Sequence, residues 1–206
     1  MANRTFLICA VIVLTALAFY ACSENTSGES TAATTAPPEK PKYGGYETQV
    51  QWGEHIVTIA GCNDCHTPKK MTPMGPVNDT SLMLSGHPEN APAPDVDRKM
   101  VESKGLVVSQ DFTSWVGPWG ITYTANLTPD PSGTGNWTED QFVYALKNLI
   151  SKGLPSSRHL LPPMSMMPVT EMTEDEIRAI YAYLRTIKPI KNNSVQPTPP
   201  VLPPKK

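Results

Sequence analysis

Cys62-Asn63-Asp64-Cys65-His66 is the most informative run of residues in this 206-residue chain. Its two cysteines, three positions apart, can lie on one face of a helical turn, and the histidine follows the second cysteine directly. At this spacing each thiol can form a thioether with one vinyl group on the edge of a haem, and the imidazole can bind the iron. The run therefore predicts a covalent haem that is attached at Cys62 and Cys65 and ligated by His66.

Two other interpretations of a Cys-x-x-Cys pair fit this chain less well. A thioredoxin-like dithiol lies at a strand-to-helix turn in a βαβ pattern, and the sequence around residues 62–66 lacks that pattern. A structural zinc site needs four Cys or His ligands, whereas the remaining cysteines, Cys9 and Cys22, lie in or beside an N-terminal apolar segment. Because the full motif occurs once, we expect one haem.

The N-terminal segment predicts export. Arg4 is followed by an apolar run that ends at Ala21, which is typical of a signal peptide covering residues 1–21. The residues up to Cys22 resemble a bacterial lipoprotein signal, so we expect a lipid on Cys22 that anchors the protein in a membrane. An uncleaved anchor and a soluble product are the alternatives. Each of the three places the rest of the chain in the periplasm or elsewhere in the cell envelope.

Composition divides the rest of the chain into three parts. Residues 22–42 are rich in Ser, Thr, Ala and Pro and predict a disordered tether, and residues 192–206 form a proline-rich C-terminal tail. The folded part is therefore expected at residues 43–191, a size that supports one domain. The formal net charge of −2 argues against a nucleic-acid partner.

Apolar residues at helical spacing predict three helices in the folded part, at residues 46–62, 138–152 and 173–187. Gly153 and Pro189 are expected to end the second and the third helix. The same two helices begin with the capping-box pattern, which pairs Thr138 with Gln141 and Thr173 with Glu176.

The segment between His66 and Trp137, about 70 residues, is dominated by Pro, Gly, Asn, Asp, Ser and Thr. We expect mostly loop and turn there, because a haem offers apolar surface on which irregular segments can pack. Helices in the rest of the folded part, with long irregular loops around the haem, predict an all-α protein.

A methionine-rich run before the third helix offers a second axial ligand for the iron. Met164, Met166 and Met167 lie among prolines that stiffen this segment, and a methionine thioether is a common haem ligand. Spacing alone does not choose among the three. His159 lies close to the run in sequence and would give bis-histidine iron instead.

Three further stretches carry a family resemblance: Thr124 to Pro131, Pro162-Pro163-Met164 with Met172 eight residues on, and Tyr183-Leu184-Arg185. Together with the haem motif they resemble the class I cytochrome c fold and, more closely, the cytochrome subunits of bacterial membrane-bound alcohol and aldehyde dehydrogenases. The resemblance implies an all-α, cytochrome c-like fold in which the N- and C-terminal helices cross, with one central helix. It also implies that Gly53 lies against Tyr183 where the two helices cross.

The same resemblance implies further site residues. In the family pattern the methionine at the Met164 position is the iron ligand, and Met167, which precedes a proline, is the alternative. The Gly75-Pro76 stretch would supply the backbone carbonyl that accepts the second N–H of His66. The candidates for contacts with the haem edge or its propionates are Tyr123, Asn126 and Trp137.

These expectations combine in an exported monohaem c-type cytochrome, an electron carrier rather than an enzyme. The expected partners are redox proteins such as a terminal oxidase, a quinol-oxidising complex or a dehydrogenase. The alternative is a fixed electron-transfer subunit of a periplasmic dehydrogenase complex. A five-coordinate haem enzyme or gas sensor would require that no residue of the methionine run binds the iron.

Overall fold

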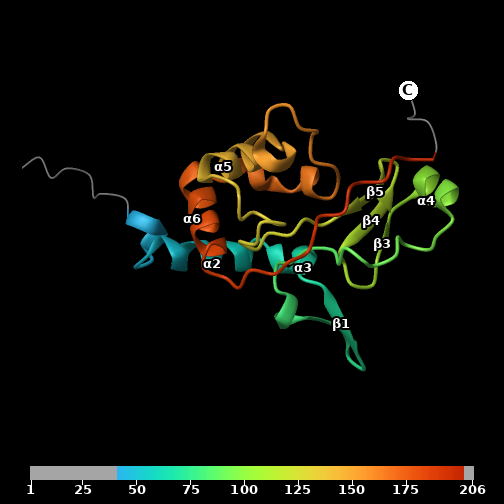
Figure 1. Ribbon diagram of the computed structural model, residues 1–206, viewed down its shortest axis with the longest axis horizontal. Helices are drawn as coiled ribbons and strands as arrows, with labels where there is room; N and C mark the ends of the chain where they lie inside the picture. Colours follow the sequence, from blue (N-terminus) through green and yellow to red (C-terminus); the bar gives the residue numbers. More distant parts are fainter. Residues whose placement is uncertain (1–40, 202–206) are drawn as a thin grey trace, which may run out of the picture. The chain divides into compact units, whose positions relative to one another are not determined.

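The computed structural model describes residues 41–201. The predicted signal peptide, the lipidation site at Cys22, nearly all of the predicted tether and the last five residues of the tail lie outside the described residues. Within residues 41–201 the chain forms five α-helices and two antiparallel sheets (Figure 1). None of the helices in this part is both long enough and apolar enough to cross a membrane.

The helical frame consists of α2 (Gln49–Ile59), α5 (Glu139–Asn148) and α6 (Glu174–Leu184), and α2 packs across α6 (Figure 1). Both predicted capping boxes are present, at Thr138 and at Thr173, and a third at Thr48 begins α2. Apolar faces of the three helices meet in one core, since each helix buries one stripe of side chains. The buried members of this core are Ile56, Val57, Leu84, Phe142, Val143, Ile177, Ala179, Ile180 and Leu184.

The ends of the helices differ from the predicted ones. The helix predicted over residues 46–62 is shorter, because it begins at Gln49 and ends at Ile59. Gly61 then adopts a left-handed conformation with φ of 66°, and a separate helix, α3 (Cys62–His66), begins after it. Helix α5 ends before Gly153, with Leu149 as a left-handed cap at φ of 53°. Helix α6 ends at Leu184, before Pro189. Short 3₁₀ turns cover Lys42–Gly45, Thr80–Leu82, Ser151–Gly153, Met164–Met166 and Pro168–Glu171.

The all-α prediction is wrong, because the segment expected to be loop contains two sheets and another helix. One sheet is the hairpin of β1 (Lys69–Thr72) and β2 (Gly75–Asn78). The other has the order β3-β4-β5 and is packed against α4. The bounds of these elements are β3 Val107–Val108, β4 Ser114–Gly117, β5 Gly120–Tyr123 and α4 Arg98–Lys104.

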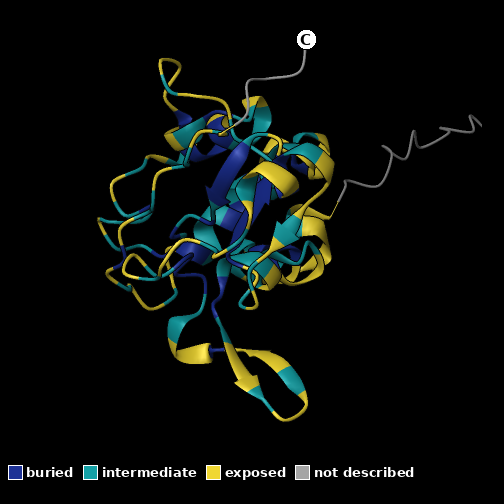
Figure 2. Ribbon diagram, turned by 90° about the vertical axis from the view of Figure 1, so that its right-hand side faces the viewer, coloured by how far each residue is buried: buried dark blue, intermediate teal, exposed yellow. Residues whose placement is uncertain are grey.

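Glycine and proline in this segment mark tight hairpin turns, which explains the difference. Gly75 and Gly120 have φ of 107° and 98°, and each begins the second strand of a hairpin. The β4–β5 hairpin is buried, and Val116 and Ile121 form a second core with Val101 of α4. The β1–β2 hairpin is largely exposed and projects from the remaining described residues (Figure 2).

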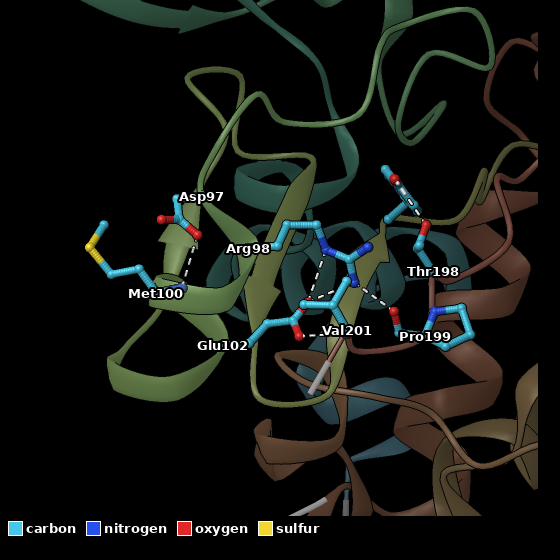
Figure 3. A network of polar contacts seen from close by, with 8 residues as sticks. Asp97, Arg98, Met100, Glu102, Thr198, Pro199 and Val201 are labelled. Carbon is cyan, nitrogen blue, oxygen red and sulfur yellow. Dashed lines mark hydrogen bonds and ion pairs between the residues drawn. The ribbon is translucent and has the colours of Figure 1, made fainter. Parts of the chain in front are cut away.

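The C-terminal segment is hydrogen-bonded to the second sheet. Thr198 and Ile121 exchange two backbone hydrogen bonds of 2.9 Å each. Glu102 of α4 accepts a hydrogen bond of 2.7 Å from the Val201 amide, and Arg98 donates one of 2.6 Å to the Pro199 carbonyl (Figure 3). The folded part therefore continues past residue 191, where the sequence predicted its end.

Candidate haem site

Both cysteines of the motif lie on the single turn of α3 and are half-buried. Burial raises the pKa of the Cys62 thiol to about 11. Burial also raises the pKa of the Cys65 thiol, and the carboxylate of Asp64 adds to that shift. A site that disfavours a thiolate suits an uncharged thioether, so this turn fits a group attached through two sulfur atoms.

The His66 imidazole has one nitrogen committed within the chain. Its Nδ1 donates a hydrogen bond of 2.8 Å to the carbonyl oxygen of Ala125. Because a carbonyl can only accept, the proton is on Nδ1, and Nε2 carries the lone pair that can bind iron. Burial lowers the pKa of His66 below its ordinary value, against the opposing effect of the Ala125 hydrogen bond, and this shift favours the neutral ring that a metal ligand requires.

The carbonyl that orients His66 does not come from Gly75-Pro76, where the family resemblance placed it. Gly75 and Pro76 belong to β2 and pair with Thr72 and Met71 of β1, and the Gly75 carbonyl accepts a hydrogen bond of 2.7 Å from Thr72. These residues are therefore engaged in the β1–β2 hairpin, and the described residues include no hydrogen bond from His66 to either of them. Ala125 was not among the predicted site residues, since it has no polar side chain to signal a role.

Backbone contacts hold the segment after β5, which carries Ala125, against the haem motif. The Gly86 amide donates a hydrogen bond of 2.8 Å to the His66 carbonyl. A Cβ at Gly86 would lie 2.5 Å from the carbonyl carbon of Ala125, so a glycine allows this approach. The hydroxyl oxygen of Thr67, the residue after His66, accepts a hydrogen bond of 2.9 Å from the Leu84 amide. The histidine and its acceptor are therefore fixed by the fold and not by a flexible loop.

The methionine run forms a 3₁₀ turn in which the three side chains differ in exposure. Met164 is half-buried, whereas Met166 and Met167 are 75% and 43% exposed. An iron ligand must face the interior of a haem pocket, so this difference favours Met164. His159 is exposed and forms an isolated backbone bridge with Ile150, which disfavours it as a ligand.

The three residues predicted to lie at the haem edge, Tyr123, Asn126 and Trp137, make contacts with other residues of the protein. Both polar atoms of the Asn126 side chain are hydrogen-bonded within the chain, to groups that include Ile190 and Thr128. Trp137 packs against the helical core, and its carbonyl accepts from Tyr181 at 2.7 Å. Tyr123 packs against the second core. Their role at the haem edge stays a prediction.

Comparison with known proteins identifies the family of the chain. Residues 50–188 match the family described as cytochrome c, and the chain belongs to that family. Membership makes it an electron carrier that binds haem c covalently rather than a catalytic enzyme. The Cys62–Cys65 pair and His66 are the residues of this chain whose chemistry fits that group.

Several curated proteins are similar over part of the chain. The cytochrome c subunit of alcohol dehydrogenase (quinone) from Gluconacetobacter polyoxogenes is 34% identical over 82 residues, which is 39% of this chain and 17% of that protein. The subunit of the same name from Komagataeibacter europaeus gives the same identity, 34% over 82 residues, and the same two shares. The fructose dehydrogenase cytochrome subunit of Gluconobacter japonicus is 33% identical over 75 residues, or 35% of this chain and 15% of that protein. The matched segments thus span less than a fifth of each of these relatives.

Proposed function

We propose that this chain is an exported monohaem cytochrome c that transfers single electrons between redox partners, with His66 and Met164 as the axial iron ligands. The proposal depends chiefly on the hydrogen bond from His66 Nδ1 to the Ala125 carbonyl, which leaves Nε2 as a neutral donor in a fixed direction. With both axial positions filled by the protein, the iron has no open position for a substrate, which suits an electron carrier.

The choice of Met164 follows from burial within the methionine run. Met166 and Met167 are exposed, whereas Met164 is half-buried, and a ligand to a haem iron has to be shielded from solvent. A thioether is a weak, neutral ligand that stabilises ferrous iron and raises the reduction potential. A carrier with such a ligand would accept electrons from a dehydrogenase and pass them to a terminal oxidase.

The proposed partner is a dehydrogenase, with a quinol-oxidising complex as another donor. The supporting observation is that similar proteins are named as cytochrome subunits of dehydrogenases. A lipid on Cys22 would hold the carrier near membrane partners at a raised effective concentration. A fixed subunit of a periplasmic dehydrogenase complex is the second candidate, favoured by the same names, and co-purification at a constant stoichiometric ratio would distinguish it from a mobile carrier.

The test is the visible spectrum of the purified holoprotein, oxidised and reduced, with and without carbon monoxide. We expect one haem per chain by pyridine haemochrome assay, a weak red methionine–iron band in the oxidised form and no response to carbon monoxide. Met164→Ala should keep the covalent haem but lose the red band and bind carbon monoxide. Met166→Ala is the matched control and should behave as the wild type; a reversed result would show that the ligand assignment is wrong.

A further inference from the structure

The β4–β5 hairpin is hydrogen-bonded to the loop that carries Met164. The hydroxyl of Thr122 donates a hydrogen bond of 2.6 Å to the carbonyl oxygen of Pro162, two residues before Met164. Thr122 lies on β5 and is only 7% exposed, so water does not replace this bond readily. The contact joins two segments 40 residues apart in sequence.

The direction of the Thr122 hydroxyl is set by a second donor. The indole Nε1 of Trp119 donates to Thr122 Oγ1 at 3.3 Å, so the hydroxyl accepts from the indole and sends its own proton to Pro162. The Trp119 ring lies over Gly117, where a Cβ would be 2.6 Å from the ring. The turn between β4 and β5 thus holds the indole in the position from which it donates.

Prolines leave the methionine loop with few donors of its own. Pro162, Pro163 and Pro168 have no backbone N–H, and the amides of Ser165, Met166 and Met167 donate within the loop. A bond from the hairpin to a carbonyl oxygen of the loop is therefore the contact that this segment can readily accept. A weak thioether ligand needs a loop that holds it in place, because the strength of the iron–sulfur bond does not. A side-chain donor on the hairpin supplies such a restraint.

We infer that Thr122 is a positioning residue for the sixth iron ligand. Three residues after it, Ala125 accepts the hydrogen bond that orients His66. Thr122 on β5 and Ala125 just after β5 would therefore each restrain one of the two proposed iron ligands: the Thr122 hydroxyl acts on the loop of Met164, and the Ala125 carbonyl acts on His66. This inference rests on the proposed ligation by Met164.

The experiment compares Thr122→Val, Thr122→Ala and Thr122→Ser in the full-length holoprotein. Valine keeps the shape and methyl of threonine but removes the hydroxyl, alanine removes both, and serine keeps the hydroxyl. We expect Val and Ala to retain covalent haem but to weaken the red methionine–iron band and to raise the fraction of reduced protein that binds carbon monoxide by about tenfold. Serine should restore the wild-type spectrum, which a purely packing role would not do.

Thr124→Val is the matched control. Thr124 is 8% exposed and its hydroxyl donates at 3.3 Å to the Thr113 carbonyl within the hairpin, not to the methionine loop. It should leave the red band unchanged. If Thr122→Ala and Thr122→Val both keep the band while Met164→Ala loses it, the positioning role is overturned and the ligand assignment stands. If Met164→Ala keeps the band, both proposals fail. If Thr122→Val takes up no haem, the comparison of Thr122→Ala with Thr122→Ser tests the positioning role by itself.

Discussion

Gly53 of α2 lies directly against the backbone of Ala179 of α6. A Cβ at position 53 would be 1.9 Å from the carbonyl oxygen of Ala179 and 3.0 Å from the Cβ of Tyr183. The two helices can cross this closely only because position 53 has no side chain. Helix α3 with its haem motif follows α2 directly, and α6 follows the methionine loop, so this crossing ties the two ligand-bearing segments together.

Gly53→Ala should destabilise the protein although alanine is the better helix former. The gain in helix propensity is about 1 kcal/mol. The clash is with a backbone carbonyl that cannot rotate away, and overpacking of this kind costs about 1–3 kcal/mol or more. We expect a lower midpoint in guanidinium unfolding followed by far-UV circular dichroism.

Gly105→Ala serves as the control, because a Cβ at position 105 meets no atom within 4 Å. Its midpoint should stay close to that of the wild type. Equal midpoints for the two variants would mean that α2 can move away from α6 at little cost, contrary to the close crossing.

The crossing and the helices that form it could be predicted from the sequence. A glycine inside an apolar helical stripe indicates close approach, and the capping boxes at Thr138 and Thr173 lie where predicted. Local chemistry determines these features, since cap and helix are neighbours in the chain. The box of Thr48 with Gln51 obeys the same rule and could have been predicted in the same way.

The sheets and the orientation of His66 could not be predicted from local sequence. Strands of four residues such as β4 and β5 show too little periodicity to stand out from turns, and they become stable only by pairing with each other and packing on α4. The acceptor for His66 is a main-chain carbonyl at Ala125, 59 residues away. Any residue has such a carbonyl, so only the fold can select it.

His87 is a buried residue without a part in the proposed electron transfer. It is 2% exposed, and its Nδ1 lies 2.7 Å from the hydroxyl of Thr113, which in turn donates to Asp111. Its Nε2 has no hydrogen-bond partner within the described residues. Burial lowers the pKa of His87, and the nearby Asp111 carboxylate opposes that shift only in part.

Stability should therefore fall as the pH is lowered past the ordinary histidine pKa of about 6.5. Between that value and the lower pKa in the fold, the unfolded chain binds a proton that folded His87 does not, so acid favours unfolding. His87→Gln removes this titration and should reduce the loss of stability between about pH 7.5 and about pH 5.5 by up to about 1 kcal/mol. Guanidinium unfolding at the two pH values measures the difference.

His55→Gln changes an exposed histidine and is the comparison for this experiment. The same dependence in His87→Gln as in the wild type would mean that His87 takes up its proton in the folded state as easily as in the unfolded chain.

Glu102 and Arg98 of α4 hold the C-terminal segment against β5 (Figure 3). Glu102 is 4% exposed, and its two carboxylate oxygens accept from Arg98 at 2.6 Å and from the Val201 amide at 2.7 Å. The chain beside this contact pairs with Ile121 on the strand that also carries Thr122. The contact therefore helps to fix β5, the strand that is hydrogen-bonded to the loop of Met164.

Glu102→Gln should loosen this segment. The glutamine side chain has one oxygen and one NH₂ group, so its NH₂ group would face either Arg98 or the Val201 amide, both of which are donors. Hydrogen bonds to a charged group are each worth about 1.5–3 kcal/mol, so local opening should become at least about tenfold more frequent. Hydrogen exchange read by mass spectrometry should show faster exchange at the amides of Ile121 and Thr198. Lys99→Gln alters the charge of an exposed residue on the same helix and should leave that exchange unchanged. Unaltered protection in Glu102→Gln would assign the stability of the segment to its backbone pairing with β5 alone.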